Sequence, residues 1–241
     1  PVCLSIERIY ELLDMNDEND GREKQLDSAL TDIELQNISF RFKDDLPNVF
    51  ENISFHMEKG DQVLLQGENG SGKTTLVKLL LGLYAPTSGT IRMNGQDAAA
   101  LNCDSIRKHI GVVSQSIFLF RGTVLSNILY GQEGKTRQDV ESLVDRLGLQ
   151  EYMDRMPKGL DTDINQNTSG VSGGQAQIIA FIRALLSQKD LIILDEPISN
   201  VDAETRDLLL RILKERRYDG MLLVISHQTE GMEFLNKVIK I

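Results

Sequence analysis

The chain has 241 residues and a formal net charge of −10. That length allows one or two domains with a buried core. An acidic chain repels the phosphate backbone of nucleic acid, so nucleic acid is not an expected partner. No apolar run approaches the roughly 20 residues that cross a bilayer. The two cysteines, Cys3 and Cys103, have neither metal-ligand spacing nor a disulfide framework.

Acidic residues are concentrated at the start of the chain. Residues 1–45 hold 12 acidic and five basic side chains, and we interpret the acidic start as a solvated linker. Within it, Ile6, Ile9 and Leu13 have the spacing of a short amphipathic helix. Residues 16–31 are polar and predict a loop or linker. Because the sequence begins with proline rather than methionine, we expect it to be a piece of a longer polypeptide.

Two β-like runs follow, at residues 33–42 and 49–57. A third apolar run, residues 63–65, leads into a glycine-rich turn and then a helical pattern. The leucines expected on one face of this helix are Leu76, Leu79, Leu80 and Leu83.

The second half of the chain begins with a mainly helical pattern over residues 117–190. Short unbroken apolar runs follow at residues 191–194 and 221–225, as is typical of parallel strands buried on both faces. Strands that alternate with helices predict an α/β sheet, here interrupted by a helical insertion.

Residues 67–74 read GENGSGKT and fit the phosphate-loop pattern G-x-x-x-x-G-K-[ST]. The glycines let backbone amides surround a phosphate chain, and the following helix presents its positive end to the same phosphates. We expect Lys73 to reach the β- and γ-phosphates and the Thr74 hydroxyl to bind Mg²⁺. The alternative, a glycine-rich turn that matches by chance, is disfavoured because the motif lies between a strand and a helix.

Two carboxylates, Asp195 and Glu196, follow the apolar run at residues 191–194. Ligands of open α/β sheets bind beyond the carboxyl ends of the strands. Asp195 is therefore expected to hold Mg²⁺ through its water shell. Glu196, on the opposite side by strand alternation, is expected to orient or deprotonate the attacking water. In isolation such a pair more often caps a helix; the phosphate loop makes the catalytic interpretation the favoured one.

Further motifs make a family resemblance specific. Residues 171–175, VSGGQ, resemble the signature motif of ABC ATPases. Gln115 matches the Q-loop, residues 199–202 match the D-loop, and His227 matches the switch histidine. Phe42, 25 residues before Gly67, stands where the family keeps an aromatic that stacks on adenine. Over residues 33–241 the chain thus resembles the ATP-binding domain of an exporter-type ABC transporter.

The resemblance implies an α/β fold of the P-loop NTPase (RecA-like) type, with an antiparallel β subdomain and an α-helical signature-motif subdomain. The core is expected at about residues 32–115 and 188–241, and the helical subdomain at about 116–187. Residues 1–31 are expected to be a linker that follows a membrane domain, fused on the amino-terminal side. The domain itself is expected at the cytoplasmic face of a membrane.

The resemblance also implies ATP hydrolysis with Mg²⁺ in a head-to-tail pair of domains, a homodimer with ATP. Each ATP would touch the phosphate loop of one domain and the signature motif of the other. Catalytic roles are implied for Glu196, His227, Lys73 and Gln115, and Mg²⁺ binding for Thr74, Gln115 and Asp195. Nucleotide contacts are implied for Phe42, Gly67, Asn69, Gly70, Ser71, Gly72, Lys73, Thr74, Thr75, Ser172, Gly173, Gly174, Gln175 and Asp202.

Taken alone, several of these residues have simpler interpretations. The Ser-Gly-Gly of the signature motif could be a plain helix cap, and His227 could be a core histidine. Gln115 could be an ordinary polar loop residue. Phe42 could belong to the core, and Asp202 could be a turn residue.

Two segments favour an exporter. Residues 5–14 resemble the linker helix after a last membrane span, and residues 118–128 resemble the surface patch that receives the membrane domain. The alternative is that Phe118 and Phe120 belong to a helical core. A non-transport ABC ATPase is disfavoured by the acidic charge and by the short interval between Q-loop and signature, and a binding-only domain by the presence of Glu196 and His227.

Some positions depart from the family pattern. Val171 replaces the usual leucine of the signature motif. Asn165 and Gln166 replace a glycine and a glutamate, which puts the detail of coupling to the membrane domain in doubt. Ala176 and Ile178 replace arginines after the signature, and slower hydrolysis is expected.

Overall fold

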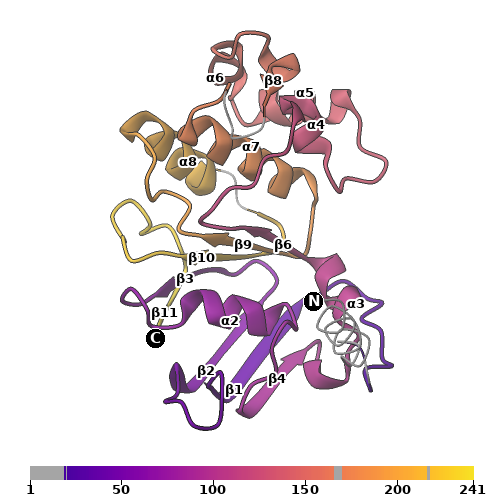
Figure 1. Ribbon diagram of the computed structural model, residues 1–241, viewed down its shortest axis with the longest axis vertical. Helices are drawn as coiled ribbons and strands as arrows, with labels where there is room; N and C mark the ends of the chain where they lie inside the picture. Colours follow the sequence, from indigo (N-terminus) through magenta and orange to yellow (C-terminus); the bar gives the residue numbers. More distant parts are fainter. Residues whose placement is uncertain (1–18, 20, 166–169, 216–217) are drawn as a thin grey trace, which may run out of the picture.

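The computed structural model describes residues 19, 21–165, 170–215 and 218–241. Its layers are a helical region, a central parallel sheet, the helix α2 (Lys73–Leu80), and an antiparallel sheet on the far side of α2 (Figure 1). None of the helices in these ranges is long and apolar enough to cross a membrane. The helix expected at the amino end of the chain lies outside the described residues.

The central sheet has five parallel strands in the order β11-β3-β10-β9-β6. Their bounds are β3 (Gln62–Gln66), β6 (Ile110–Val113), β9 (Leu191–Asp195), β10 (Met221–Ile225) and β11 (Lys237–Lys240). Every residue of β9 and β10 is buried. The prediction of parallel strands covered on both faces is therefore confirmed for the two unbroken apolar runs.

The two faces of this sheet belong to two separate hydrophobic clusters. Leu64, Ile192 and Val224 pack with the helical region. Their neighbours Leu65 and Ile193 point the other way and pack with α2 and the antiparallel sheet. Successive side chains of a strand point to opposite faces, so one apolar run supplies both cores.

The second sheet is antiparallel, with the order β2-β1-β4-β5. Its strands are β1 (Asp32–Phe40), β2 (Phe50–Glu58), β4 (Ser88–Met93) and β5 (Gln96–Asp97). The first two confirm the strands predicted at 33–42 and 49–57 to within two residues at each end. Leu76, Leu79 and Leu80 of α2 are buried as predicted, but Leu83 lies beyond the end of the helix and is exposed.

The region between β6 and β9 is mainly helical, as predicted. Its helices are α4 (Val124–Leu129), α5 (Arg137–Arg146), α6 (Gln150–Asp154), the 3₁₀ turn η2 (Gly159–Asp161) and α7 (Gly173–Leu186). A short β-pair, β7 (Gly122–Thr123) with β8 (Asp163–Ile164), interrupts them. After β9 the chain forms α8 (Ala203–Glu215), which packs against α7 (Figure 1).

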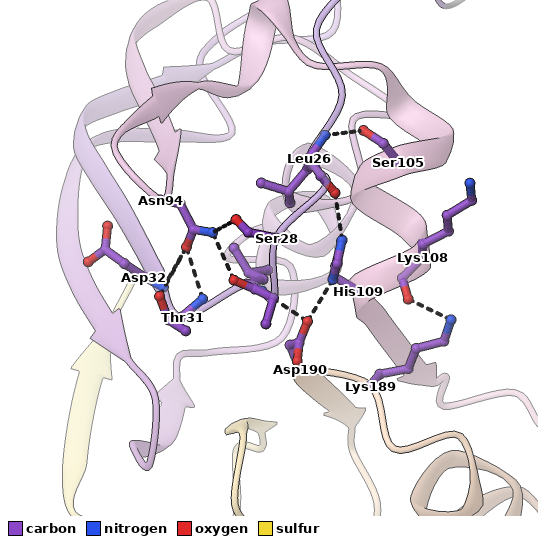
Figure 2. Close-up of polar contacts among 12 residues, drawn as sticks. Leu26, Ser28, Thr31, Asp32, Asn94, Ser105, Lys108, His109, Lys189 and Asp190 are labelled. Atoms are coloured by element: carbon purple, nitrogen blue, oxygen red, sulfur yellow. Dashed lines mark hydrogen bonds and ion pairs between the residues drawn. The ribbon is translucent and has the colours of Figure 1, made fainter.

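The part of the linker that the structure describes is not simply solvated, which corrects the interpretation of the acidic start. Leu26 and Leu30 are each only 2% exposed and belong to the cluster beneath the central sheet. This segment lies against α3 (Cys103–His109), a helix that the sequence pattern did not reveal. His109, the last residue of α3, joins this segment to the start of β9, because its ring nitrogens contact the Leu26 carbonyl at 2.8 Å and the carboxylate of Asp190, which precedes β9, at 2.6 Å (Figure 2).

Candidate nucleotide site

The order of the central strands brings the predicted site residues to one edge. β3, β10, β9 and β6 are neighbours and parallel, so their carboxyl ends lie side by side. The phosphate loop follows β3, His227 follows β10, Glu196 follows β9, and Gln115 follows β6. The sheet thereby gathers four segments that are up to 160 residues apart in sequence, at the edge where open α/β sheets bind ligands.

The phosphate loop has a backbone that only glycine fits at two of its positions. A Cβ on Gly67 would lie 2.5 Å from Ser71 Oγ and 2.6 Å from the Ile241 carbonyl oxygen. Gly72 has φ +94°, and a Cβ there would lie 2.7 Å from side-chain atoms of Val49 and Phe50. These glycines let the loop fold tightly and pack closely against the neighbouring residues Val49, Phe50 and Ile241.

The interior of the loop is prepared for an anion. Lys73 is buried, and its ammonium donates hydrogen bonds of 2.8 Å to the carbonyls of Gly67 and Glu68. The Ser71 hydroxyl is also buried and has no hydrogen-bond partner among the described residues. Helix α2 begins at Lys73 without a side-chain cap and with no acidic residue in its first turn. A buried charge, an orphaned hydroxyl and an uncapped helix start together fit a bound phosphate chain.

The side chains predicted to hold Mg²⁺ meet in space. Thr74 Oγ1 donates a hydrogen bond of 3.1 Å to Asp195 Oδ2, across 121 residues of sequence. Burial raises the pKa of Asp195, and the neighbouring Glu196 carboxylate adds to that effect, while Thr74 and Lys73 act against it. Hydroxyl and carboxylate oxygens are the ligands that Mg²⁺ prefers, usually one or two of them beside substrate phosphates. The described residues contain no cluster of three or more His, Cys, Asp or Glu suited to a metal.

Glu196 and His227 form the second contact pair of the site. Glu196 is buried, and its Oε1 lies 2.8 Å from His227 Nδ1 and accepts a hydrogen bond of 3.2 Å from the His227 backbone amide. Glu196 has φ +51°, a left-handed conformation that turns its side chain away from the path of β9. His227 is exposed, which excludes the alternative of a core histidine.

Phe42 and Gln115, two further predicted residues, are both exposed. Phe42 is 53% exposed, so it is not a core residue, and its ring packs edge-on against Phe40 and Tyr84 at centroid distances of 5.1 and 5.8 Å. One face of an aromatic ring on the surface fits a stacking platform. Gln115 is exposed in the loop after β6.

The signature motif forms the start of α7. Ser172 caps this helix: its Oγ accepts a hydrogen bond from the Gln175 amide, and Gln175 Oε1 accepts one from the Ser172 amide. The signature motif therefore does form a helix cap, as in the simpler interpretation. The start of α7 is also exposed, which leaves the motif accessible to a ligand. Gly174 packs closely on Asp202, whose carboxylate accepts hydrogen bonds from the amide and hydroxyl of Thr205.

The structure therefore assembles two groups of predicted residues and does not join them. The phosphate loop, Asp195, Glu196 and His227 form one group, and the signature motif with Asp202 forms the other. Among the contacts of the described residues, none links residues 172–175 to residues 67–74. Asn69 lies in the loop and Thr75 next to it, and neither side chain makes a hydrogen bond or ion pair among the described residues. Gln166 lies outside these residues.

Two residues at the site were not predicted. Tyr84 packs on Phe42, and Ser226, fully buried, lies 3.5 Å from Glu196 Oε2 and accepts a hydrogen bond from the Gln228 amide. Neither residue belongs to a motif with fixed spacing. Ser226 could have been found by its position between the apolar run of β10 and His227.

Comparison with known proteins decides the family. The sequence profile described as ABC transporter matches residues 50–199. The chain belongs to the ABC transporter family. An ATP-dependent lipid A-core flippase of Aliivibrio fischeri is 34% identical over 96% of this chain and 40% of the flippase. ABC transporter B family member 29, chloroplastic, of Arabidopsis thaliana is 34% identical over 97% of this chain and 38% of that protein.

A solved structure supports the fold of this ABC transporter chain. A bacterial Atm1-family ABC exporter with ATP bound superposes with a TM-score of 0.84 at 24% identity, over 99% of this chain and 42% of that one. The chain thus spans about two fifths of the length of the relatives it matches. It corresponds to one part of larger transporters.

Proposed function

We propose that this chain is the ATP-binding and ATP-hydrolysing motor domain of an exporter-type ABC transporter. The observation that carries the proposal is the meeting of Thr74 and Asp195 at the mouth of the phosphate loop, with Glu196 and His227 on the adjoining strand ends. Thr74 lies on α2, which follows β3, and the other three residues lie at or just after the ends of β9 and β10, so only the folded sheet brings these groups together.

In this proposal Lys73 and the amides of the phosphate loop bind the β- and γ-phosphates of ATP. Thr74 and Asp195 would hold Mg²⁺, with Gln115 contributing from the loop after β6. The ion would supply charge neutralisation on the phosphate oxygens. Phe42 would stack on the adenine, with Tyr84 fixing its ring from the side.

Glu196 is proposed to orient the attacking water and to take up its proton. Its second oxygen lies near Ser226 and its first is held by His227, so the carboxylate has a defined orientation. His227 is on the surface beside it and would contact the γ-phosphate.

A second copy of the chain is proposed to complete each site. The start of α7, with Ser172 and Gly173 exposed, offers hydroxyl and amide donors to an anion, yet no contact joins it to the phosphate loop of the same chain. A head-to-tail homodimer would place each signature motif over the other chain's ATP, and Asp202 near the facing phosphate loop.

The proposed partner on the membrane side is a transmembrane domain, fused before this chain, with the ATPase at the cytoplasmic face. A named lipid flippase and a named exporter are among the proteins that this chain is similar to. Phe118 is 77% exposed beside a cleft of about 230 Å³, and Arg183 Nη2 in that cleft is buried without a hydrogen-bond partner among the described residues. An exposed aromatic and an unused donor suit a docking segment. A non-transport ABC ATPase is the less supported alternative.

The test is steady-state ATP hydrolysis by the purified chain with Mg²⁺. Glu196→Gln is expected to lower the rate by roughly 10²–10⁴-fold while ATP binding persists, and Lys73→Ala is expected to abolish binding and turnover. Glu141→Gln, an exposed carboxylate on α5, is the matched control and should keep the wild-type rate. A wild-type rate of ATP hydrolysis no higher than that of Lys73→Ala would refute the proposed ATPase activity.

A further inference from the structure

A second cavity of about 460 Å³ lies at the opposite ends of the strands that carry the nucleotide site. Its floor is formed where β9 and β10 begin, by Asp190 and Gly220, together with the linker residues Leu30 and Thr31. Figure 2 shows this floor: residues 28–31 run beside Asp190, and the Leu30 amide donates a hydrogen bond of 2.9 Å to the Asp190 carboxylate. None of the predicted nucleotide-site residues lines this cavity.

The walls of the cavity are apolar. They come from the carboxyl-terminal halves of three helices, α5, α7 and α8, which meet over the sheet at this point. The lining side chains from these helices include Leu143, Leu147, Phe181, Leu185, Ile212 and Leu213. A cavity of roughly 300–1,000 Å³ with apolar walls and a few polar groups is the usual form of a small-molecule site.

The charged side chains that line this cavity are three basic and two acidic, and Thr31, Gln188 and Tyr218 add neutral polar groups. Lys59, Arg146 and Lys189 line it, against two carboxylates, Asp190 and Asp219. The Asp190 carboxylate is already engaged by the Leu30 amide and by His109. Lys189 donates to the Lys108 carbonyl at 2.6 Å (Figure 2). Within the described part of the chain, neither Lys59 nor Arg146 has an ion-pair partner.

A cavity with this wall and rim selects its ligand by two properties. The leucines and Phe181 favour an apolar body, because its transfer from water contributes about 25 cal/mol per Å² of buried apolar surface. The lining has three cations against the two carboxylates Asp190 and Asp219, so its excess of one positive charge favours a single negative charge on the ligand and opposes a positive one. We propose that this cavity binds an amphipathic anion with a single apolar tail and one carboxylate, of the fatty-acid class.

Such a ligand would touch three parts of the fold at once. It would contact the linker at Leu30, the edge of the central sheet at Asp190, and the helical region at Leu147 and Phe181. The ligand would therefore restrain the helical region relative to the linker, without competing with ATP at the other edge of the sheet.

The experiment is a calorimetric titration of the chain with laurate below its critical micelle concentration. Saturable binding of one laurate per chain is expected, and dodecyltrimethylammonium, with a tail of the same length and the opposite charge, should bind at least tenfold more weakly. Methyl resonances of Leu147 and Leu213 should shift on titration, while those of Leu76 on α2 should not. Equal binding of the two amphiphiles, or no saturable binding of laurate, would overturn the proposal.

Three variants locate the site. Leu185→Trp fills the cavity and is expected to abolish laurate binding. Arg146→Gln removes a rim charge without changing the wall and should weaken binding about three- to tenfold. Arg206→Gln, an exposed arginine on α8 outside the cavity, is the control and should bind as the wild type does. An Arg146→Gln affinity equal to that of Arg206→Gln would contradict the assigned rim, even if Leu185→Trp failed to fold. The titration needs no nucleotide, so its outcome is separate from that of the proposed ATPase.

Discussion

Gly173 and Gly174 are neighbours in the signature motif with different surroundings. A Cβ built on Gly174 would lie 2.5 Å from Thr205 Oγ1 and 2.8 Å from Asp202 Oδ2, whereas one on Gly173 would meet nothing within 4 Å. Gly174→Ala is therefore expected to push α7 and α8 apart and to lower the free energy of unfolding by about 1–3 kcal/mol. Gly173→Ala should leave that free energy within about 0.5 kcal/mol of the wild-type value.

Chemical denaturation of the two variants without nucleotide measures both values. The paired design matters because each variant adds the same methyl group to the same turn of helix. If the two lost equal stability, the close approach of Asp202 to α7 would not be the reason for glycine at Gly174.

At the residue scale, the sequence contains most of the nucleotide site because the chemistry demands fixed spacing. The phosphate loop needs glycines at set intervals before Lys73, so its pattern can be recognised without a structure. The contact between Thr74 and Asp195 follows from that pattern only once the strand order is known. Tyr84 could not be assigned, because no spacing links it to Phe42, whereas the position of Ser226 directly before His227 was a usable signal.

Asp61, which directly precedes β3, is hydrogen-bonded to β2 and to β11 at the edge of the central sheet. It is buried between β2 and β3, and its carboxylate accepts hydrogen bonds from the Glu58 amide, Asn236 and Lys237. Burial acts to raise the pKa of Asp61. The hydrogen bond and charge of Lys237, the Glu58 amide and Asn236 lower it by more, so the pKa of Asp61 lies below its ordinary value. Ionised Asp61 therefore stabilises the fold.

The direction of the pH dependence follows from this lowered pKa. The stabilisation is present above the pKa of an unfolded aspartate, about 3.9, and is lost as pH falls through the lower pKa of the folded state. Asp61→Asn is expected to lower the free energy of unfolding by about 1–3 kcal/mol at neutral pH and by progressively less in acid. Urea denaturation of both chains between pH 7 and pH 3 measures this loss of unfolding free energy. A loss that stayed constant over this range would exclude ionised Asp61 as the cause. Asp97→Asn, an exposed carboxylate on β5, is the control.

At the element scale, prediction succeeded for long or uniformly apolar runs and failed for short ones. The strands β4 and β6 and the helix α3 were not predicted, since each is short and its apolar residues are interrupted by glycine or polar residues. A usable signal was present at β4: Asn94 and Gly95 follow it with φ values of +50° and +74°, and Asn-Gly is the commonest two-residue hairpin turn. The burial of Leu26 and Leu30 gave no such signal, because two leucines in a polar stretch set no period.

In the proposed dimer each chain would supply one half of each of two ATP sites, and each chain carries a net charge of −10. Pairing of two such chains is opposed by their like charge, and salt screens that repulsion over about 10 Å at 0.1 M ionic strength. Sedimentation of Glu196→Gln with ATP and Mg²⁺ is expected to show a species of twice the 27.0 kDa chain mass, increasing in amount with salt. Lys73→Ala should remain monomeric under the same conditions, and a dimer that formed equally well without ATP would contradict a nucleotide-bridged pair.

Mixing of two inactive chains tests the composite site directly. Gly173→Arg is expected to fold, because the position is open, and to block the signature motif with a bulky side chain. Lys73→Ala keeps its signature motif and loses its own phosphate loop. Each variant alone should be inactive, but a mixed dimer contains one site with an intact phosphate loop from the first chain and an intact signature motif from the second. Mixing is expected to restore hydrolysis, at up to about half the wild-type rate per mixed dimer, and this result would require that ATP bridges two chains. If Gly173→Arg were active by itself, one chain would suffice for hydrolysis.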